Sequence, residues 1–361
     1  METLRVIQVT HSFPPYVGGL SNMTEMLSKN LVKLGHEVEV VTLDVEGGLP
    51  KCESMEGVSI RRFKGYAPSG AYFAPSTAAY RYLESVRGDV IHAHNIAALL
   101  VPACWMAVRG RLDSTAFVIT PHHHSAGSKW HTRLLWRPYR PVARRVMRAA
   151  DVIHCVSSFE AGVVKHDFGV DSMVVPNGVS EDVANYQWSP SSDLVLTYAG
   201  RLEGYKRIDS IVLAAHRLAK EGREVHVRIV GDGPDLSRLV SLGQSLDVNI
   251  QHFHFLQREE YLRMLSTSSC LVNVSEYEAF SIVVAEAIAM GVPTIAAAPW
   301  GGTFAGMPGV QLVDGSSAEA IARAVDALSS NHCEKTHIPS WPEIANRLTS
   351  EAYLPALSRK A

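Results

Sequence analysis

The sequence contains little cysteine, and the cysteines it has are widely spaced. Only five occur in 361 residues, and none forms a Cys-x-x-Cys pair. This spacing argues against a zinc site and favours a reduced, intracellular compartment. An excess of one charge is also lacking, because 34 basic residues nearly balance 36 acidic ones. We therefore expect no nucleic-acid partner, since such a partner requires a strongly basic surface.

Long hydrophobic runs are missing as well. The longest uncharged apolar run near a helix, Ile96–Val108, is too short to span a bilayer. The first residues, Met1–Thr10, enter a strand pattern directly and show no signal-peptide core. We expect a cytoplasmic protein, either soluble or peripheral on the inner face of the membrane.

Two ligand-binding motifs are absent. No G-x-G-x-x-G follows the opening strand of either half of the chain, which argues against a dinucleotide cofactor. No Asp-x-Asp pair is present to hold Mg²⁺ or Mn²⁺. We expect a protein without a metal ion or other cofactor.

What the chain does contain is a regular alternation of strand-length apolar runs and helix-length amphipathic segments, typical of open parallel α/β sheets. In the first half, strands are expected at Leu4–Thr10, Glu37–Thr42, Val90–Ala93, Phe117–Thr120, Val152–Cys155 and Met173–Val175. In the second half, they are expected at Leu194–Ala199, His226–Val230, Ile250–Phe253, Cys270–Asn273 and Thr294–Ala297. The alternation restarts after the polar segment Ser180–Asp193, whose composition is that of a linker.

The predicted fold class is therefore α/β, with two Rossmann-like domains whose parallel sheets face each other across a cleft that binds the ligand. The length of the chain suits two domains of ordinary size. The first is expected over residues 1–183 and the second over residues 194–340. The C-terminal segment 341–361 is expected to be helical and to pack back on the first domain.

One segment of the second half, Ser275–Gly291, has an unusual charge pattern. It carries Glu278 and Glu286, and Glu286 is the only charged residue in the tract 279–313. A buried carboxylate without a partner costs several kcal/mol. A ligand must therefore meet Glu286, or else an arginine or a backbone amide inside the core.

The same segment predicts a helix that begins in a loop suited to anions. The helix after Ser281 is apolar all round, which indicates burial, and Gly291 ends it. The loop Glu278-Ala279-Phe280-Ser281 then offers backbone N–H groups and the positive helix end to phosphate or sugar oxygens.

Basic residues and glycines follow several strands at their carboxyl ends. Arg201 and Lys206 come after Leu194–Ala199, where cations suit a diphosphate, whereas Arg207 is expected on the solvated surface. Two pairs of glycines, which allow close backbone approach to a ligand but also occur in plain turns, are Gly18 with Gly19 and Gly231 with Gly233.

Three successive histidines, His122, His123 and His124, also follow a strand. Neighbours in extended chain point to opposite faces, so all three cannot hold one metal ion. We interpret His122 as a hydrogen-bond donor that faces the cleft, and leave the other two unassigned.

The span Ser114–Ala150 contains no acidic residue. Its seven basic residues are Lys129, Arg133, Arg137, Arg140, Arg144, Arg145 and Arg148, interleaved with Trp130, Trp136 and Tyr139. The spacing would place five arginines on one helix face, but Pro138 and Pro141 are expected to break a continuous helix. Such a tract, 129–148, suits an anionic membrane surface or an anionic acceptor; a solvated basic face is the alternative.

Taken together, these segments resemble the glycosyltransferases of family four, which have the two-domain GT-B fold. The resemblance covers most of the chain in the correct order. It rests on the Gly-Gly loop with LGHEVEVVT after its helix, DVIHAHN, ITPHHH, AADVIHCVSSFE, VPNGV, AGRLEGYKRID, IVGDGP, and the two glutamates of the segment that ends in AMGVPTIA. Two departures are Arg207, where the family has glycine, and GGTFAG after Trp300, which lacks the usual glutamate.

The resemblance implies transfer of a sugar from a UDP- or GDP-sugar to an acceptor, with retention of anomeric configuration. It implies that Glu286 binds the donor ribose, that Glu278 and the amides of Ala279, Phe280 and Ser281 hold the sugar hydroxyls, that Arg201 and Lys206 clamp the diphosphate, and that His122 lies beside the transferred sugar. The acceptor is unknown, and a lipid-linked molecule is one candidate. Two alternatives remain, a sugar-nucleotide 2-epimerase and a sugar-nucleotide sensor without turnover.

Overall fold

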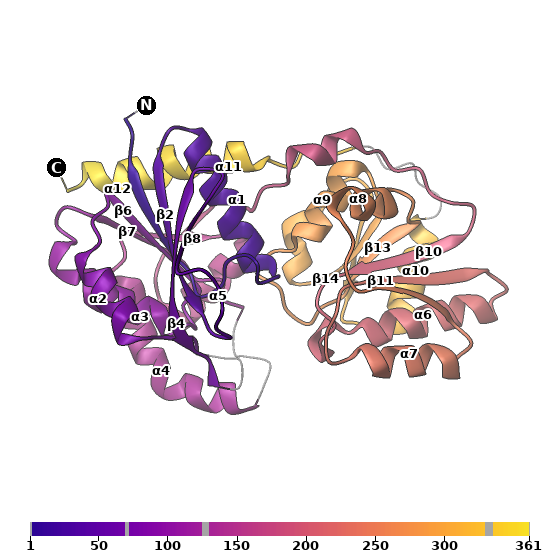
Figure 1. The fold of residues 1–361 in the computed structure, drawn as a ribbon. Coiled ribbons are helices and arrows are strands. Elements are labelled where there is room, and N and C mark those ends of the chain that lie inside the picture. The colour runs from indigo at the N-terminus through magenta and orange to yellow at the C-terminus, as the bar shows by residue number, and fades with distance from the viewer. Residues whose placement is uncertain (1, 69–71, 125–129, 329–334, 361) are drawn as a thin grey trace. The chain divides into compact units, whose positions relative to one another are not determined.

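The computed structural model describes residues 2–68, 72–124, 130–328 and 335–360, without the side chains of residues 130–135. The chain divides into two compact units (Figure 1). The first consists of Met1–Asn177 with Trp341–Ala361, and the second of Gly178–Ser340. Each unit is built around its own sheet.

The first unit contains a mostly parallel sheet. Its strands are β1 (Arg5–Val9), β2 (Glu37–Asp44), β3 (Cys52–Met55), β4 (Val58–Tyr66), β5 (Ala74–Pro75), β6 (Val90–His94), β7 (Ala116–Thr120), β8 (Val152–Cys155) and β9 (Met173–Val174). The order is β3-β4-β2-β1-β6-β7-β8-β9, and β5 pairs with β4. Only β3 and β5 run antiparallel to their neighbour. The remaining strands present their carboxyl ends at one edge of the sheet.

Helices cover both faces of this sheet (Figure 1). They are α1 (Gly19–Lys33), α2 (Thr77–Ser85), α3 (Leu100–Val108), α4 (Trp130–Arg148), α5 (Ser158–Phe168), α11 (Trp341–Leu348) and α12 (Leu354–Ser358), with the short 3-10 helix η2 (Arg109–Arg111) and the π-helical segment η6 (Thr349–Tyr353) that joins α11 to α12. The C-terminal elements belong to this unit, because α11 packs on α1 and η6 packs on β7.

The second unit contains a six-stranded, fully parallel sheet in the order β12-β11-β10-β13-β14-β15. Its strands are β10 (Leu194–Ala199), β11 (Val225–Val230), β12 (Asn249–Phe253), β13 (Cys270–Asn273), β14 (Thr294–Ala298) and β15 (Val310–Asp314). Its helices are α6 (Ile208–Lys220), α7 (Leu236–Ser245), α8 (Arg258–Ser266), α9 (Ile282–Met290) and α10 (Ala318–Leu328), with the short turns η3 (Glu181–Asn185), η4 (Gly204–Lys206) and η5 (Trp300–Phe304).

The segment Ser180–Asp193 is not a free linker. It belongs to the second unit, and its backbone is tied there by hydrogen bonds from Trp188 N to Met290 O and from Ser189 N to Ser266 O. The Trp188 indole also donates to Ser268 O at 2.9 Å. This segment therefore has the polar composition of a linker, but its backbone is fixed to the second unit.

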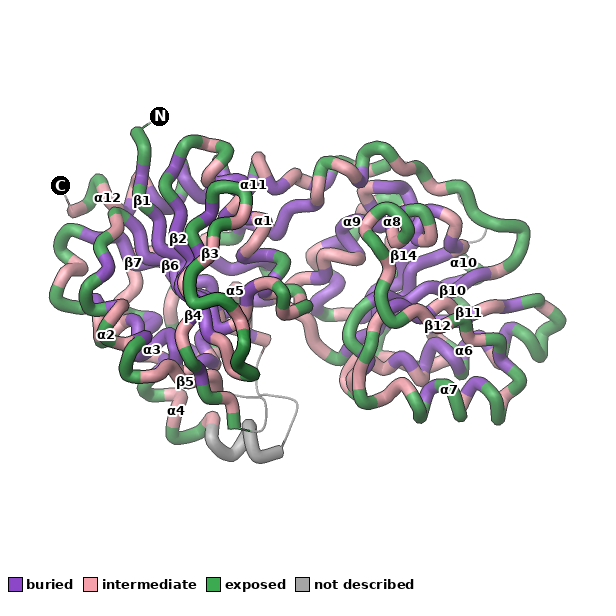
Figure 2. The backbone as a smooth tube through the Cα atoms, in the orientation of Figure 1, coloured by how far each residue is buried: buried purple, intermediate pink, exposed green. Residues whose placement is uncertain are grey.

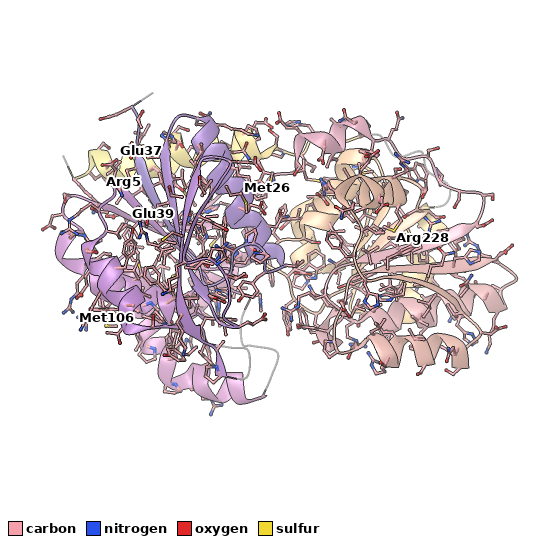
Figure 3. All side chains as sticks on the ribbon, viewed as in Figure 1. Arg5, Met26, Glu37, Glu39, Met106 and Arg228 are labelled. Atoms are coloured by element: carbon pink, nitrogen blue, oxygen red, sulfur yellow. The ribbon has the colours of Figure 1, made fainter. Side chains whose placement is uncertain are left out.

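Burial follows the position of each strand in the sheet (Figure 2). Every residue of β6 and β7 is buried, as expected for central parallel strands with helices on both faces. The outer strand β4 instead alternates between buried and more exposed residues. On neighbouring strands, Arg5 Nη2 of β1 and Glu39 Oε2 of β2 are 3.5 Å apart (Figure 3).

Candidate functional site

The loop before α9 and the helix itself form as the sequence predicts. Ser281 is the N-cap, and its side chain accepts a hydrogen bond from Val284 N. Asn273, the last residue of β13, donates to the same Ser281 oxygen at 3.0 Å. Gly291 ends the helix with φ of 77°, in the left-handed region. The first turn of α9 is thereby held at the carboxyl end of β13, with the backbone N–H groups that a helix leaves unpaired.

Lys206 and Glu278 meet at this helix terminus. They follow β10 and β13, which are neighbours in the sheet, and Lys206 Nζ lies 2.5 Å from Glu278 Oε1. Both side chains are mostly buried, at 12% and 17% exposure. Burial alone would lower the pKa of Lys206, but the Glu278 charge holds it above its usual value, so Lys206 stays charged. The pair places a fixed cation and an acceptor side by side.

The other two basic residues after β10, Arg201 and Arg207, pair with different carboxylates. The Arg201 side chain is 66% exposed, and its guanidinium pairs with Glu203 at 2.5 Å. Arg207 contacts Glu276 Oε1 at 3.3 Å, and its φ of 52° is in the left-handed region. That conformation favours glycine, which explains why the resembled family has glycine there.

The packing of the second unit explains the presence of Gly231 and Gly233. A Cβ on Gly231 would lie 2.0 Å from Gly200 O, and one on Gly233 would lie 2.3 Å from Leu202 O. The two loops are also joined by a hydrogen bond from Leu202 N to Asp232 O. These glycines let the loops after β10 and β11 pack directly on each other.

Glu286 is buried and has protein partners that sequence reasoning missed. Arg258 Nη1 donates to its Oε1 at 2.6 Å, and the Tyr261 hydroxyl donates to its Oε2 at 2.9 Å. Arg258 also forms a two-point contact with Asp182, at 2.9 and 3.0 Å. Burial raises the pKa of Glu286, and the Arg258 charge and both hydrogen bonds oppose that rise. An arginine thus meets this carboxylate, as one of the alternatives left open above expected, but Arg258 is a partly exposed residue at the start of α8 and does not lie inside the core.

In the first unit, the Gly18-Gly19 loop precedes α1. A Cβ on either glycine would meet nothing within 4 Å, so the surrounding chain does not require glycine at these positions. The φ of Gly18, 164°, is extended backbone that any residue adopts. The space beside these two residues is open.

His122 follows β7 in a left-handed conformation, with φ of 46°. Burial, with smaller contributions from neighbouring histidines, lowers its pKa to about 3, so the ring is neutral. Its Nε2 atom is buried and has no hydrogen-bond partner within the described part of the chain. The His94 ring lies 5.8 Å away between centroids. His122 therefore retains an unused polar atom.

The neighbouring histidines do not converge on a metal. His123 Nε2 lies 2.7 Å from Asp167 Oδ2, and its backbone N–H donates to Glu160. Within the described residues, no group of three or more His, Cys, Asp or Glu side chains is arranged to hold a metal ion. Glu160 was missed by sequence reasoning, although Ser157 and Glu160 form the S-x-x-E pattern of a helix start, and Ser157 is the N-cap of α5.

The basic tract forms one helix, so the expected break at its prolines is wrong. The helix α4 runs through Pro138 and Pro141 without interruption. Both prolines are exposed, so water can reach the carbonyl groups that they deprive of an intrahelical donor. Lys129 lies outside the described residues, as do the side chains of Trp130 and Arg133.

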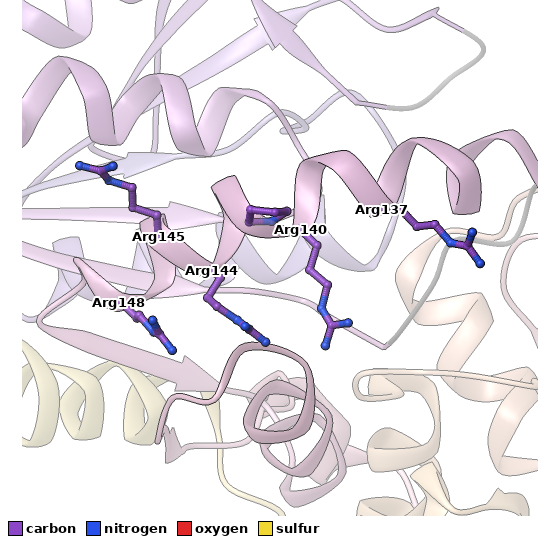
Figure 4. A pocket seen from close by; sticks show the side chains of 6 residues that line it. Arg137, Arg140, Arg144, Arg145 and Arg148 are labelled. Carbon is purple, nitrogen blue, oxygen red and sulfur yellow. The ribbon is translucent and has the colours of Figure 1, made fainter.

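Five arginines of α4 line an open hollow of about 540 Å³ (Figure 4). Arg137, Arg140, Arg144 and Arg148 project from one side of the helix, and Arg145 projects from another. Arg140 and Arg144 also donate to Asp167 O near the end of α5. The described residues include no helix long and apolar enough to cross a membrane.

Comparison with known proteins identifies the family. Residues 17–183 match the model of Glycosyltransferase Family 4, and residues 184–341 match that of Glycosyl transferases group 1. The chain therefore belongs to the family-four glycosyltransferases and has the GT-B fold, as its sequence motifs predicted. It is a glycosyltransferase.

Among curated relatives, the chain is 28% identical to a GDP-mannose-dependent alpha-mannosyltransferase of Mycobacterium tuberculosis, over 81% of this chain and 79% of that protein. It is 25% identical to a glycogen synthase of the same organism, over 81% and 77%. Among solved structures, sucrose-phosphate synthase from Thermosynechococcus elongatus matches with a TM-score of 0.73 and 18% identity, covering 98% and 97% of the two chains. Anabaena Alr3699/HepE, in complex with UDP and glucose, matches with a TM-score of 0.69 and 15% identity, covering 99% and 98%.

Proposed function

We propose that this glycosyltransferase moves a hexosyl group from a GDP- or UDP-sugar to an acceptor, with retention of anomeric configuration and without a metal ion. The observation that carries the proposal is the buried pair of Lys206 and Glu278 at the first turn of α9. A relative that is named for GDP-mannose and a structural neighbour that holds UDP support the choice of donors.

In the proposed site, Lys206 and Arg201 contact the diphosphate. Charge develops on that group as the bond from the sugar to the phosphate breaks. A preorganised cation and a helix N-terminus stabilise such charge without reorganisation, which is the part a metal ion plays in other sites. Lys206 suits this task because it is already held and charged in a largely buried environment.

Other residues hold the donor. Glu278 accepts hydrogen bonds from the sugar hydroxyls, which it shares with the amides of Ala279, Phe280 and Ser281. Glu286 accepts from the ribose diol. Gly231 and Gly233 shape the loops beside the diphosphate, and their packing on Gly200 and Leu202 is compatible with that part.

Two features of the first unit suit a sugar donor by their own geometry. The Gly18-Gly19 loop approaches the donor closely, for which the open space at both glycines leaves room. His122 hydrogen-bonds the transferred sugar through its buried Nε2, which has no partner among the described residues. Because the ring is neutral, it offers one donor and one acceptor rather than a charge.

The acceptor is proposed to be anionic or lipid-linked, with α4 docking on an anionic membrane surface. The arginines on one side of this helix would supply charge attraction. Trp136 and Tyr139 do not add an interfacial anchor, because Trp136 stacks on His123 and the Tyr139 hydroxyl donates to Ile96 O in the core of the first unit. A cytoplasmic protein, peripheral on the inner face of the membrane, would fit this arrangement.

The test of the proposed function is a thermal-shift screen of GDP-, UDP- and ADP-sugars in EDTA, because a ligand that binds the folded state raises its stability. The best donor is then incubated with and without candidate acceptors, and the anomeric configuration of the product is read by NMR. We expect acceptor-dependent transfer with retention in EDTA. Isomerised sugar from donor alone would indicate an epimerase, and binding without turnover a sensor. An inverted product, or activity that requires added Mn²⁺, would contradict the mechanism.

A further inference from the structure

Glu286 is held by two side chains of one helix. Arg258 is the first residue of α8, and Tyr261 lies one turn further along the same helix. Arg258 Nη1 donates to one carboxylate oxygen at 2.6 Å, and the Tyr261 hydroxyl donates to the other at 2.9 Å. The Glu286 side chain is only 5% exposed. Its orientation is therefore set from one side by α8.

Arg258 also reaches a second carboxylate. Its Nε and Nη2 atoms donate to the two oxygens of Asp182, at 2.9 and 3.0 Å. This two-point geometry is the strongest that arginine makes with a carboxylate. Asp182 lies in η3, shortly after Gly178, where the second unit begins. One guanidinium thus bridges the opening segment of the unit and Glu286.

We propose that Arg258 is a positioning residue for the donor: it aims the Glu286 carboxylate at the ribose and, through Asp182, makes that contact depend on the order of the η3 segment. The proposal rests on the proposed function, in which Glu286 accepts hydrogen bonds from the ribose diol.

The hydrogen-bonding capacity of Glu286 fits this part. An ionised carboxylate has about four acceptor positions, two on each oxygen. Arg258 and Tyr261 use one position on each oxygen, which leaves one on each for a vicinal diol. Burial favours the protonated carboxyl, which would present a competing donor, and Arg258 opposes this protonation. Without Arg258, Glu286 would lose one of the two groups that fix its orientation and the cation that opposes its protonation.

A merely structural ion pair would act differently. Its loss would lower the stability of the protein but would not distinguish a ligand with ribose hydroxyls from one without them. A positioning residue must affect the ribose contact selectively. Binding linkage adds a second requirement, because coupling between η3 and the ribose is reciprocal: if Asp182 supports nucleotide binding, nucleotide binding must stabilise the Asp182 segment.

The experiment compares the affinities of GDP and UDP with those of their 2′,3′-dideoxy forms by calorimetry. We expect the folded wild type to prefer the ribose form of the better base at least tenfold. Arg258→Gln should reduce that preference to less than threefold, mostly through weaker binding of the ribose form. The matched control is Arg263→Gln, which removes an exposed arginine of the same helix that pairs with Glu259; it should keep the wild-type preference.

Asp182→Asn serves as a second variant, because it leaves the pair of Arg258 and Glu286 in place and removes only the outer anchor. We expect it to reduce the ribose preference severalfold. GDP or UDP, whichever binds with higher affinity, should slow the hydrogen exchange of the backbone amides of residues 181–186 in the wild type. It should not slow their exchange in Arg258→Gln. If Arg258→Gln does not fold, Asp182→Asn and the exchange data of the wild type decide the question.

The outcomes distinguish an error in the proposed role of Glu286 from an error in the positioning role of Arg258. If the wild type shows no ribose preference, or Glu286→Gln leaves that preference unchanged, the proposed function of Glu286 is wrong. If Glu286→Gln abolishes the preference while Arg258→Gln and Asp182→Asn retain it in full, the ribose site stands and the positioning role of Arg258 is overturned.

Discussion

The two units share one architecture but differ in the polar groups buried near the carboxyl ends of their central strands. In the first unit, uncharged imidazoles fill the space at the carboxyl ends of the central strands. In the second unit, the corresponding region contains carboxylates, each held by a cation. The difference teaches that the same sheet edge can be made polar either by neutral hydrogen-bonding groups or by compensated charge, with different consequences for pH and for mutation.

The first unit contains a continuous chain of neutral hydrogen bonds. The Tyr353 hydroxyl lies 2.8 Å from His92 Nδ1, and His92 Nε2 lies 2.7 Å from the Thr120 hydroxyl. Thr120 in turn contacts His154 Nδ1 at 2.7 Å, and His154 Nε2 donates to Val175 O at 2.8 Å. Because C-terminal Tyr353 closes this chain, it ties η6 to the sheet.

The second unit uses ion pairs instead. Lys206 with Glu278, and Arg258 with both Glu286 and Asp182, place opposite charges in direct contact. Removing one partner of a buried pair leaves an uncompensated charge, which is strongly destabilising. We therefore expect acid to act mainly on the first unit, and single charge substitutions mainly on the second.

The largest predicted effect is the loss of the first unit in mild acid. Burial lowers the pKa of His11 and His154 to about 4 and of His122 to about 3, and it lowers those of His92 and His94 well below the usual 6.5. The unfolded chain then binds more protons, so this stability is present above pH 6.5 and is lost as pH falls. Each histidine loses about 1.4 kcal/mol at one pH unit below 6.5, or about 7 kcal/mol for the five. Hydrogen exchange at pH 5.5 should show β6 and β7 losing protection before β10 and β13.

Glu160 acts in the opposite direction. Burial raises its pKa from 4.5 to about 7, so the folded state binds its proton more readily. Its contribution to stability is fully present below pH 4.5 and is lost as pH rises through 7, which offsets roughly 2 kcal/mol of the histidine effect at pH 5.5. Glu160→Gln should therefore steepen the loss of stability between pH 7 and 5.5. Equal protection of both units at pH 5.5 would contradict the comparison.

The next effect concerns Lys206. Lys206→Ala should lower kcat by 10²- to 10³-fold, about 3–4 kcal/mol, and should raise apparent KM less, because the cation gains most as charge develops on the leaving diphosphate. The measurement is steady-state kinetics with the donor from the screen. Lys220→Ala, at an exposed position at the end of α6, is the control and should behave as wild type. A Lys206 variant that changes only KM would assign the residue to ground-state binding.

A smaller effect is expected at Glu286. Glu286→Gln keeps the shape of the side chain but removes its charge, so it should weaken donor binding about tenfold, or about 1.4 kcal/mol, with little change in kcat. A hydrogen bond to the ribose acts in the ground state and the transition state alike. Direct titration with the nucleoside diphosphate measures the change. An effect on kcat as large as that of Lys206→Ala would argue against this division of roles.

The sequence predicted the strands of both sheets well where apolar runs are continuous. The bounds of β8, β10 and β13 match the expected ranges, and the segment around Glu278 forms the expected helix start. Such strands are buried on both faces, so their composition is distinctive. Strands far from the centre of the sheet are less visible: β4, which lies between β3 and β2, mixes apolar residues with polar and charged ones, and no strand was expected there.

The partners within the site were harder to predict than the site itself. The isolation of Glu286 in an apolar tract showed that something must meet it, but it could not identify Arg258. That residue comes from another helix, and nothing in its local pattern distinguishes it from the exposed Arg263. The prediction that the prolines of α4 break the helix was wrong for a related reason. The rule against proline within helices assumes that the carbonyl groups left without a donor are buried, and it is weaker where water can reach them.

The smallest predicted effect concerns the arginines of α4, which would extend the use of charge to the surface of the first unit. Each arginine near an anionic membrane contributes about 1 kcal/mol, so Arg137→Gln or Arg148→Gln should each weaken liposome binding about fivefold. Because screening shortens the reach of the field, binding should also fade as salt rises. Co-sedimentation with liposomes of phosphatidylcholine, with and without phosphatidylserine, measures both effects.

The structure adds a control within the same helix. Arg140 and Arg144 already donate to Asp167 O, so their substitution should also loosen the contact between α4 and α5, and thermal unfolding should report that loss. Arg137→Gln and Arg148→Gln should leave the unfolding temperature nearly unchanged and alter only the binding to lipid. If the wild type sediments equally with neutral and anionic liposomes, the basic side of α4 is a solvated surface and the proposed membrane docking is wrong.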